Sequence, residues 1–311
     1  MRVFLSGATG VIGRRVLSLL VSGGHRVTAV GRSLDKRRAL EAKGANAIDV
    51  DLFDESALRL ALAGHDTVIN LATHMPSSFT KMLIRWNWRE NDHIRREGSA
   101  ALVNAALASG VTRFIQESFA PIYADGGDRW LDETSPVRTV SYNRTVLDAE
   151  RSAERFSAGT AGQVGIVTRF AAFYGPDSRV THELLGMMRR GWAPLPGSPS
   201  AFLSSISHDD AATAVVAALE APSGIYNVCD DEPLRRAEWF DAFANAYGIG
   251  HLRPLPDWVS TLGGSIMELM GRSLRLTNAK LRAATGWAPK YPSVREGFQA
   301  MAAAAPSERA A

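Results

Sequence analysis

The chain has 311 residues, of which 46% are hydrophobic and 22% are charged, and its formal net charge is +3 at pH 7. This composition is typical of a soluble globular protein with enough apolar side chains for a sizeable core. The single cysteine, Cys229, excludes an internal disulfide and a cysteine-rich metal site, and we expect no metal centre.

Charge and hydropathy patterns limit the classes of partner. Short basic clusters at 35–38, 95–96, 189–190 and 235–236 are scattered, whereas a nucleic-acid-binding protein more often gathers them into one stripe. The most apolar late segment, 258–270, is too short and too interrupted to span a bilayer, and "MRVFLSG" shows no secretory signal. We therefore expect a cytoplasmic protein with a small-molecule substrate, no nucleic-acid partner and no membrane partner. A homodimer is left open.

Short β-branched runs alternate with helical patterns through the first two thirds of the chain. This alternation predicts a parallel sheet covered by helices on both faces, which is a Rossmann-like doubly wound α/β fold. The expected strands are 2–7, 26–31, 47–50, 66–72, 113–118 and 162–170, and the expected helices include 13–23, 34–44 and one that begins at Tyr142.

After about residue 170 proline, glycine and tryptophan become frequent. Residues 224–228 predict a strand that returns to the sheet, and 232–304 predict mainly helices and loops. We expect a dinucleotide-binding domain over residues 1–175 and a smaller, mostly helical substrate region over 176–311, with 203–230 returning to the first domain. Ligands of such folds bind at the carboxyl edge of the sheet, where this region is expected.

The segment "GATGVIG" lies between the first expected strand and the first expected helix. Its glycines let the backbone turn tightly and approach a pyrophosphate, which the free N–H groups of the helix start then stabilise. Because the segment follows a strand and opens a helix, its context supports a dinucleotide site. The expected contacts are Gly7, Thr9, Gly10, Val11, Ile12 and Gly13.

The second expected strand is followed by Gly31 and Arg32. An NAD site usually has an acidic residue here, which holds the ribose 2′-hydroxyl. An arginine suits a 2′-phosphate, because its planar guanidinium makes bidentate contacts. We therefore expect NADP, with NAD less favoured. A solvated arginine at a strand end is the alternative.

Six segments in order resemble the extended short-chain dehydrogenase/reductase superfamily, in its NAD-dependent epimerase/dehydratase branch. They are "GATGVIG", Asp51–Leu52, "NLAT" (70–73), "RFAAFYGP" (169–176), "YNV" (226–228) and "GWAPKYPSVREGF" (286–298). The resemblance implies that Asp51 and Leu52 contact adenine. It also implies that Leu71, Ala72 and Thr73 line the ribose and pyrophosphate.

The resemblance further implies a catalytic centre of a serine or threonine, a tyrosine, and a lysine four residues after the tyrosine. Ser118 matches the serine, and Tyr142 matches the tyrosine and is also expected to border the cofactor. Val146 stands in the place of the lysine. A tyrosine pKa near its ordinary value of about 10 is too high for proton transfer at neutral pH, and the lysine normally lowers it. The substitution puts the family's mechanism in doubt.

Other interpretations of the same residues stay open. Tyr142 and Val146 also fit the spacing of a core-facing helical stripe, and Ser118 fits a cap at a strand end. Glu117 is a second candidate acid–base group if it is buried, with an ion-paired surface carboxylate as the alternative.

The connection 74–97 is unusually long and carries aromatic residues, which is typical of a lid or a binding loop. The expected substrate pocket contains His74, Trp86, Trp88, Tyr123, Phe173 and Trp192. Packing of the aromatic residues between the two regions of the chain is an equal alternative. The first functional hypothesis is an NADP-dependent oxidoreductase, epimerase or dehydratase-like enzyme for a small hydroxyl or carbonyl compound. The second is a catalytically degenerate NADP-binding sensor or partner-binding protein, and the third is a non-redox lyase or isomerase that uses Glu117 or a histidine.

Overall fold

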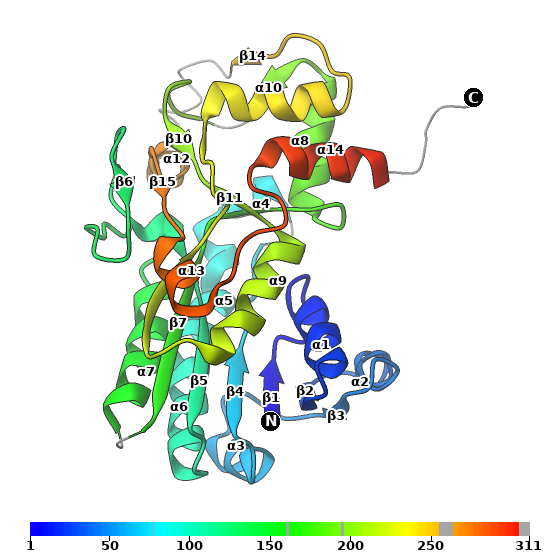
Figure 1. Ribbon diagram of the computed structural model, residues 1–311, viewed down its shortest axis with the longest axis vertical. Helices are drawn as coiled ribbons and strands as arrows, with labels where there is room; N and C mark the ends of the chain where they lie inside the picture. The colour runs from blue at the N-terminus through cyan, green and yellow to red at the C-terminus, as the bar shows by residue number, and fades with distance from the viewer. Residues whose placement is uncertain (77, 160–161, 194–195, 255–263, 305–311) are drawn as a thin grey trace.

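The computed structural model describes residues 1–76, 78–159, 162–193, 196–254 and 264–304 (Figure 1). The start of the late apolar segment, 258–263, lies outside the described residues. Across the described residues the central sheet has seven strands in the order β12-β7-β5-β4-β1-β2-β3, and all neighbours are parallel. The strand order reverses between β1 and β4, and ligands of such sheets bind at this crevice. The doubly wound fold expected from the sequence is confirmed.

The strands of this sheet are short and almost continuously apolar. Their bounds are β1 (Arg2–Ser6), β2 (Arg26–Val30), β3 (Asn46–Ile48), β4 (Thr67–Asn70), β5 (Arg113–Phe119), β7 (Val164–Phe170) and β12 (Gly224–Val228). In β1 all residues after Arg2 are buried, because helices cover both faces of a parallel sheet. β12 pairs with β7 along its whole length, so the late segment 224–228 does return to the sheet.

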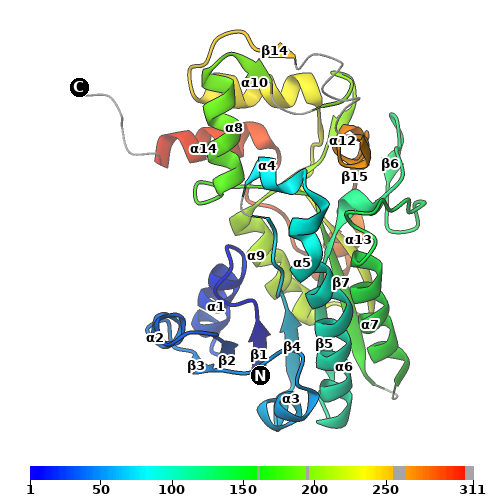
Figure 2. The ribbon, with the colours of Figure 1, turned by 180° about the vertical axis from the view of Figure 1, so that it is seen from behind.

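Two helical layers enclose the sheet, as the opposite views of Figures 1 and 2 show. One layer contains α1 (Gly13–Ser22), α2 (Leu34–Glu41), α9 (His208–Ala217) and α13 (Ala279–Thr285), and the other contains α3 (Glu55–Leu62), α6 (Ser99–Ala108) and α7 (Val146–Gly159). The apolar spacing of α1 explains its placement, since Val16, Leu17 and Leu20 share the buried face. Short turns η3 (Ala120–Ile122) and η4 (Ala218–Glu220) follow β5 and α9.

The second region lies beyond the carboxyl ends of the strands (Figure 1). Its helices are α8 (Arg179–Arg189), α10 (Arg236–Ala246), α12 (Gly264–Gly271) and α14 (Val294–Ala304). An aromatic cluster that includes Tyr174, Trp239, Phe243 and Phe298 joins α8, α10 and α14. Short ladders complete the region: β8 (Ala172–Tyr174) with β11 (Ser205–Ser207), β10 (Phe202–Leu203) with β13 (Leu234–Arg235), β9 (Trp192–Ala193) with β14 (Arg253–Pro254), and β6 (Trp130–Leu131) with β15 (Arg275–Leu276).

Residues 74–93, here called the β4–α5 segment, are largely helical rather than an open loop. The segment forms α4 (Phe79–Met82), η1 (Arg85–Trp88) and α5 (Arg89–His93), and the π-helical turn η2 (Ile94–Gly98) joins it to α6. Of the helices in the described residues, none combines the length and the apolar character that crossing a membrane requires.

The expectation that a helix begins at Tyr142 is wrong. Residues 141–145 form turns closed by bonds between residues three apart, such as Val146 N to Asn143 O at 3.1 Å, and α7 begins at Val146. Tyr142 is therefore placed by a turn rather than by a helix.

Candidate active site

The loop after β1 fits a pyrophosphate. Gly7 has a φ of +74°, and a Cβ there would overlap the carbonyl oxygen of Leu71 at the end of β4. A Cβ at Gly13 would overlap the carbonyl of Gly7. Side chains at either position would therefore push β1, β4 and α1 apart, and glycine keeps the backbone within reach of a ligand.

The start of α1 offers an anion its backbone N–H groups. Its N-cap residue, Ile12, forms no side-chain cap, and its first turn holds no acidic residue. The first N–H groups of a helix lack partners within the helix and carry partial positive charge, so a phosphate is stabilised there. Thr9 and Gly10 are exposed at this point, while Val11 and Ile12 are half-buried.

Asn70 fixes the end of β4 beside this loop. Its Oδ1 accepts from Ser6 Oγ at 2.6 Å and from the Ala72 backbone at 3.3 Å, while its Nδ2 donates to Gln116 Oε1 at 2.9 Å. From there Leu71 is buried, Ala72 is half-buried and Thr73 is exposed. The segment thus emerges at the carboxyl edge next to the glycines.

Arg32 projects from the end of β2 with 69% of its side chain exposed. Its guanidinium lies 3.6 Å from Glu90 Oε1, and the same oxygen lies 3.3 Å from His74 Nδ1. Glu90 belongs to α5, so an ion pair links the predicted 2′-phosphate position to the β4–α5 segment. A 2′-phosphate at Arg32 would compete with Glu90 for the guanidinium.

The expected adenine residues lie farther along the same edge. Asp51 is exposed, and its carboxylate accepts from the Phe53 backbone at 3.0 Å. Leu52 is half-buried against Gly98, and the ring of Phe53 stacks on His93 with centroids 4.0 Å apart.

The hydroxyl of Tyr142 is bonded to the β4–α5 segment. It donates to the Leu83 carbonyl at 2.8 Å, and the ring packs edge-on against Trp88 with centroids 5.9 Å apart. Tyr142 also packs on the apolar face of α12, formed by Ile266, Met267 and Leu269. In this conformation the hydroxyl donates to protein rather than to a ligand.

Val146 is fully buried in the first turn of α7. Its neighbour Thr145 donates to Asp92 Oδ1 at 2.8 Å, and Arg85 pairs with the other oxygen of Asp92. The Asp92 carboxylate is therefore already paired, and the Thr145 bond holds the β4–α5 segment against the start of α7.

A buried polar network joins α7 to three strands. Arg169 donates from Nε and Nη2 to both oxygens of Glu150, at 2.8 and 2.7 Å, and from Nη1 to the Tyr123 hydroxyl at 2.9 Å. Tyr123 in turn donates to Asn227 Oδ1 at 2.8 Å, and Ser118 donates to Glu150. Every charge in this network has a partner.

This network bears on two predicted site residues. Ser118 and Tyr123 are both fully buried and offer no surface to a ligand in this conformation. Burial, opposed in part by Arg169, raises the pKa of Tyr123 to about 12. In this conformation both hydroxyls bond to protein groups, so the catalytic role of Ser118 and the pocket position of Tyr123 stay predictions.

Glu117 is ion-paired but is not a surface residue. Both of its oxygens accept from Arg95 Nη2, at 2.9 and 3.3 Å, and the exposed fractions are 12% for Glu117 and 3% for Arg95. β4 and β5 pair Asn70 with Gln116, so Glu117 lies one residue beyond the end of β4, at the carboxyl edge. The Nε–H of Arg95 has no partner in the part of the chain that the structure describes.

The other predicted pocket residues are spread out. Of those that the structure describes, Trp88 contacts Tyr142, whereas Trp86 is 66% exposed with Arg89 stacked over its ring at 3.3 Å. Phe173 is half-buried between Phe170 and His208, and Trp192 is 37% exposed on β9.

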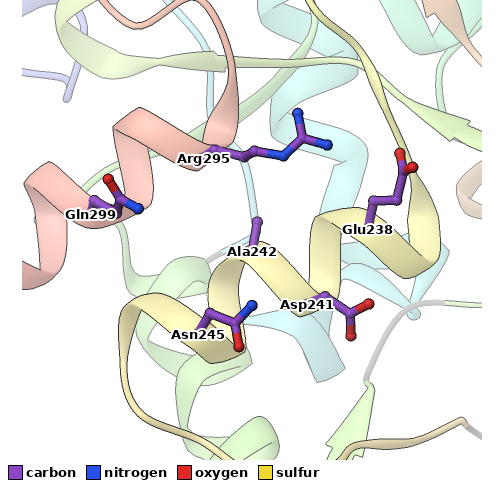
Figure 3. Close-up of a pocket in the computed structure, with 6 residues that line it drawn as sticks. All are labelled: Glu238, Asp241, Ala242, Asn245, Arg295 and Gln299. Atoms are coloured by element: carbon purple, nitrogen blue, oxygen red, sulfur yellow. The ribbon is translucent and has the colours of Figure 1, made fainter.

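Two surface grooves lie away from Tyr142. One of about 290 Å³ runs between α10 and α14 and is lined by Ala242 and by polar side chains of both helices (Figure 3). The other, of about 450 Å³, lies between α1 and α9 and is lined by residues that include Arg14, Arg15, Lys43, Asp177 and Asp209. Neither contains a predicted site residue.

Sequence reasoning missed Arg95, Glu150 and the Leu83 carbonyl. Arg95 and Arg96 form one basic pair in the sequence, yet the first is buried and the second is exposed. A π-helical turn shifts the side chains out of the ordinary helical period, so no 3.6-residue pattern marks Arg95 as internal.

The family model described as the NAD dependent epimerase/dehydratase family matches residues 3–229. A Streptomyces protein named 3-diazoavenalumate denitrifying reductase is 31% identical over 96% of this chain and 99% of its own length. The 2-alkyl-3-oxoalkanoate reductase of Shewanella oneidensis is 25% identical over 87% of this chain and 73% of its own length.

Solved structures agree on the fold. The human epimerase family protein SDR39U1, crystallised with NADPH, has a TM-score of 0.82 at 24% identity and covers 98% of this chain and 100% of its own. The Streptomyces venezuelae dTDP-glucose 4,6-dehydratase DesIV, crystallised with NAD, has a TM-score of 0.78 at 18% identity and covers 97% of this chain and 96% of its own. With the glycine loop, the strand order and the family match in agreement, the chain belongs to the NAD-dependent epimerase/dehydratase family.

Proposed function

We propose that this protein is an NADPH-dependent reductase that transfers hydride to a small electrophilic substrate without a tyrosine–lysine proton relay. The observation that carries the proposal is the fully buried Val146 at the lysine position, in a chain whose glycine loop and first helix start fit a dinucleotide. The family supports an NAD(P)-dependent, oxidoreductase-like activity.

The chain's own residues hold the cofactor, which supplies hydride when bound. The backbone between Gly7 and Gly13 takes the pyrophosphate, and Arg32 takes the 2′-phosphate once it leaves Glu90. Asp51 and Leu52 border adenine, and 71–73 border the ribose. The basic side chain at Arg32 favours NADPH over NADH.

Reduction of a carbonyl needs a proton at oxygen as well as a hydride at carbon, and general acids typically contribute about a hundredfold or more to such steps. The Tyr142 hydroxyl instead donates to Leu83, and Val146 supplies no charge to activate it. A substrate that is already electron-poor at the accepting atom does not require the proton in the same step. This chemistry suits a site that has lost its lysine.

A diazonium compound meets that requirement, and the 31% identical relative is named as a reductase that denitrifies a diazo acid. A group R–N≡N⁺ accepts hydride at its terminal nitrogen to give R–N=NH, which loses N₂ to leave R–H. The hydride supplies both the electron pair and the hydrogen, so the step balances without an acid. We therefore propose an aromatic diazo compound as the substrate class.

A second candidate is a protein that binds NADPH without turnover. It is favoured by the hydroxyls of Ser118 and Tyr142, which both bond to protein, and by Glu117, whose oxygens both accept from Arg95. Under this candidate, Arg32 and the glycine loop serve binding alone. A non-redox lyase that uses Glu117 is disfavoured by the same pairing.

One assay separates these candidates. NADPH oxidation is followed with an aromatic diazo acid, with a simple aromatic ketone and with no substrate. We expect oxidation with the diazo acid, accompanied by release of N₂. Tight NADPH binding without oxidation of either substrate would favour the sensor, and faster oxidation with the ketone would contradict the proposed chemistry.

A further inference from the structure

Arg236, at the start of α10, is a buried cation. The residue is 2% exposed, and its Nη2 donates to the Met270 carbonyl at 3.1 Å and lies 3.5 Å from the Arg272 carbonyl. Its Nε and Nη1 have no hydrogen-bond partner among the residues that the structure describes. Within the described residues no carboxylate pairs with it, and burial lowers its pKa to about 10.

Burying a charge without a partner makes the free energy of folding much less favourable. The neighbouring Arg272 adds a second buried guanidinium, which is 4% exposed and bonds to the carbonyls of Tyr123 and Arg138. The carboxylate of Glu268, which is 43% exposed, pairs with Arg272 and with Arg138. Of the two buried guanidiniums, Arg236 is the one without a carboxylate partner among the described residues.

Glycine backbone covers the free side of this guanidinium. A Cβ at Gly197 would lie 3.2 Å from Arg236 Nε and 2.8 Å from the Cα of Gly271. Gly197 has a φ of +108° and lies in an exposed stretch, 197–200. A single layer of exposed backbone thus separates the cation from solvent, and glycine at both positions allows backbone to approach an anion closely.

Helix α12 lies between Arg236 and the candidate active site, since it contacts both Arg236 and Tyr142. The carbonyl that Arg236 binds belongs to Met270, near the end of this helix, while Ile266 and Met267 pack with Tyr142 and Leu83. The four-residue step from Ile266 to Met270 rises about 6 Å along this helix. The carbonyl that Arg236 binds is therefore about one helical turn from the side chains that pack with Tyr142.

We propose that Arg236 is an oxyanion-binding site that anchors the carboxylate of an elongated substrate, whose reducible group lies on the Tyr142 side of α12. The anion supplies the missing counter-charge and accepts hydrogen bonds from the free N–H groups, and the 197–200 stretch moves outward to admit it. Free phosphate offers the same oxyanion chemistry. The assignment of the anion to the substrate rests on the proposed reductase function.

The test uses calorimetry on the full chain with three probes: 4-hydroxycinnamate, its neutral methyl ester and inorganic phosphate. We expect the acid to bind the wild type. The affinity of the ester should be lower by a factor of about ten or more, which is typical of losing one charge-assisted contact. Phosphate that displaces the acid would indicate a general oxyanion site, and phosphate that does not would indicate a carboxylate site. An ester that binds as tightly as the acid would overturn the proposal without any variant.

Variants locate the site. Arg236→Met should weaken binding of the acid about tenfold or more, yet unfold at a temperature equal to or above that of the unliganded wild type, because an unpaired buried charge is removed. Arg179→Met, on α8, is the matched control, since this exposed arginine pairs with Glu183, and it should bind as the wild type does. Unchanged binding of the acid to Arg236→Met would overturn the proposal.

NADPH oxidation with an uncharged diazo compound is measured in parallel. Its absence in the wild type would contradict the proposed reductase function rather than the anion site.

Discussion

At the scale of single residues, Val146 stands where the family has the lysine of its proton relay, and its side chain carries no charge. It is fully buried next to Thr145, whose hydroxyl bonds to the carboxylate that Arg85 already neutralises. We predict that Val146→Lys lowers the free energy of unfolding by several kcal/mol at pH 7, because an ammonium there is buried without a free partner. The loss should shrink as the pH rises toward 10, because the folded protein favours the neutral amine. Urea unfolding at pH 7 and pH 9.5 measures both effects.

The opposite outcome for this variant is also informative. Wild-type stability together with tighter NADPH binding would mean that position 146 reaches the cofactor, which contradicts its placement in the apolar interior.

Arg32 and Glu90 make a second prediction at the same scale. Glu90 holds the exposed guanidinium at 3.6 Å, so it competes with a 2′-phosphate. We expect Glu90→Gln to tighten NADPH binding while leaving NADH binding unchanged, and Arg32→Ala to remove about tenfold or more of the preference for NADPH. Calorimetric titration of both cofactors checks this. Equal affinities of the wild-type protein for NADPH and NADH would rule out the assigned role of Arg32.

Single residues also show where sequence reasoning reaches its limit. Gly7 and Gly13 were predictable, because a turn between a strand and a helix has few backbone solutions. Ser118 matched a family position, yet its hydroxyl bonds to Glu150, which lies 32 residues later. Such a partner is brought close only by tertiary packing of α7 on β5, and no local pattern encodes it.

At the scale of elements, the β4–α5 segment covers Tyr142. Its attachments are the Tyr142–Leu83 bond, the Thr145–Asp92 bond and the ring of Trp88. We predict that Tyr142→Phe removes one hydrogen bond, worth about 1 kcal/mol, and loosens this segment. Hydrogen exchange should speed up in residues 79–88 and stay unchanged in α1, which serves as the internal control. Unaltered exchange in 79–88 would show that the Leu83 contact does not hold the segment.

The sheet could be predicted from sequence far better than its connections. Strands β1, β2, β4, β5, β7 and β12 are apolar runs bounded by turn residues, and each was expected near its observed bounds. The start of α7 was missed by one turn, because periodicity continues through the turns at 141–145 and does not mark where helical hydrogen bonding begins. The β4–α5 segment was expected as a loop, yet short helical pieces form there through contacts with α7 and α12.

At the scale of the whole molecule, a cluster of charged side chains around Asp177 joins α1 to the start of α9. Asp177, which follows β8, pairs with Arg14 and Arg15 of α1 and with His208 at the start of α9. The carboxylate would favour the protonated imidazole, but two arginines already compensate it. Burial, assisted by Arg15, therefore lowers the pKa of His208 to about 4.

This cluster predicts a dependence of stability on pH. The folded-state pKa of about 4 lies below the ordinary value of 6.5, so the stabilisation is fully present above about pH 6.5 and is lost as the pH falls toward 4. Between pH 7 and pH 5 the loss should be about 2 kcal/mol. Urea unfolding of the wild type and of His208→Gln at both pH values isolates the contribution. Equal losses in the two proteins would show that other groups are responsible.

The molecule as a whole combines the fold of its family with a valine at the position of the family's lysine. The sequence resemblance predicted the family and the fold, since six motifs occur in the family's order, while the cofactor contacts stay a prediction. The role of Tyr142 depends on where its hydroxyl points, which only packing against the β4–α5 segment determines.

The rate of NADPH oxidation with an aromatic diazo carboxylate, measured together with N₂ release for the wild type and for Tyr142→Phe, tests most directly whether the chemistry proceeds without the relay. A relay-free hydride transfer predicts one N₂ per NADPH oxidised and rates for the two proteins that agree within a few fold. A loss of about a hundredfold or more in Tyr142→Phe, with NADPH binding unchanged, would show that the tyrosine acts as a general acid and would contradict a relay-free mechanism.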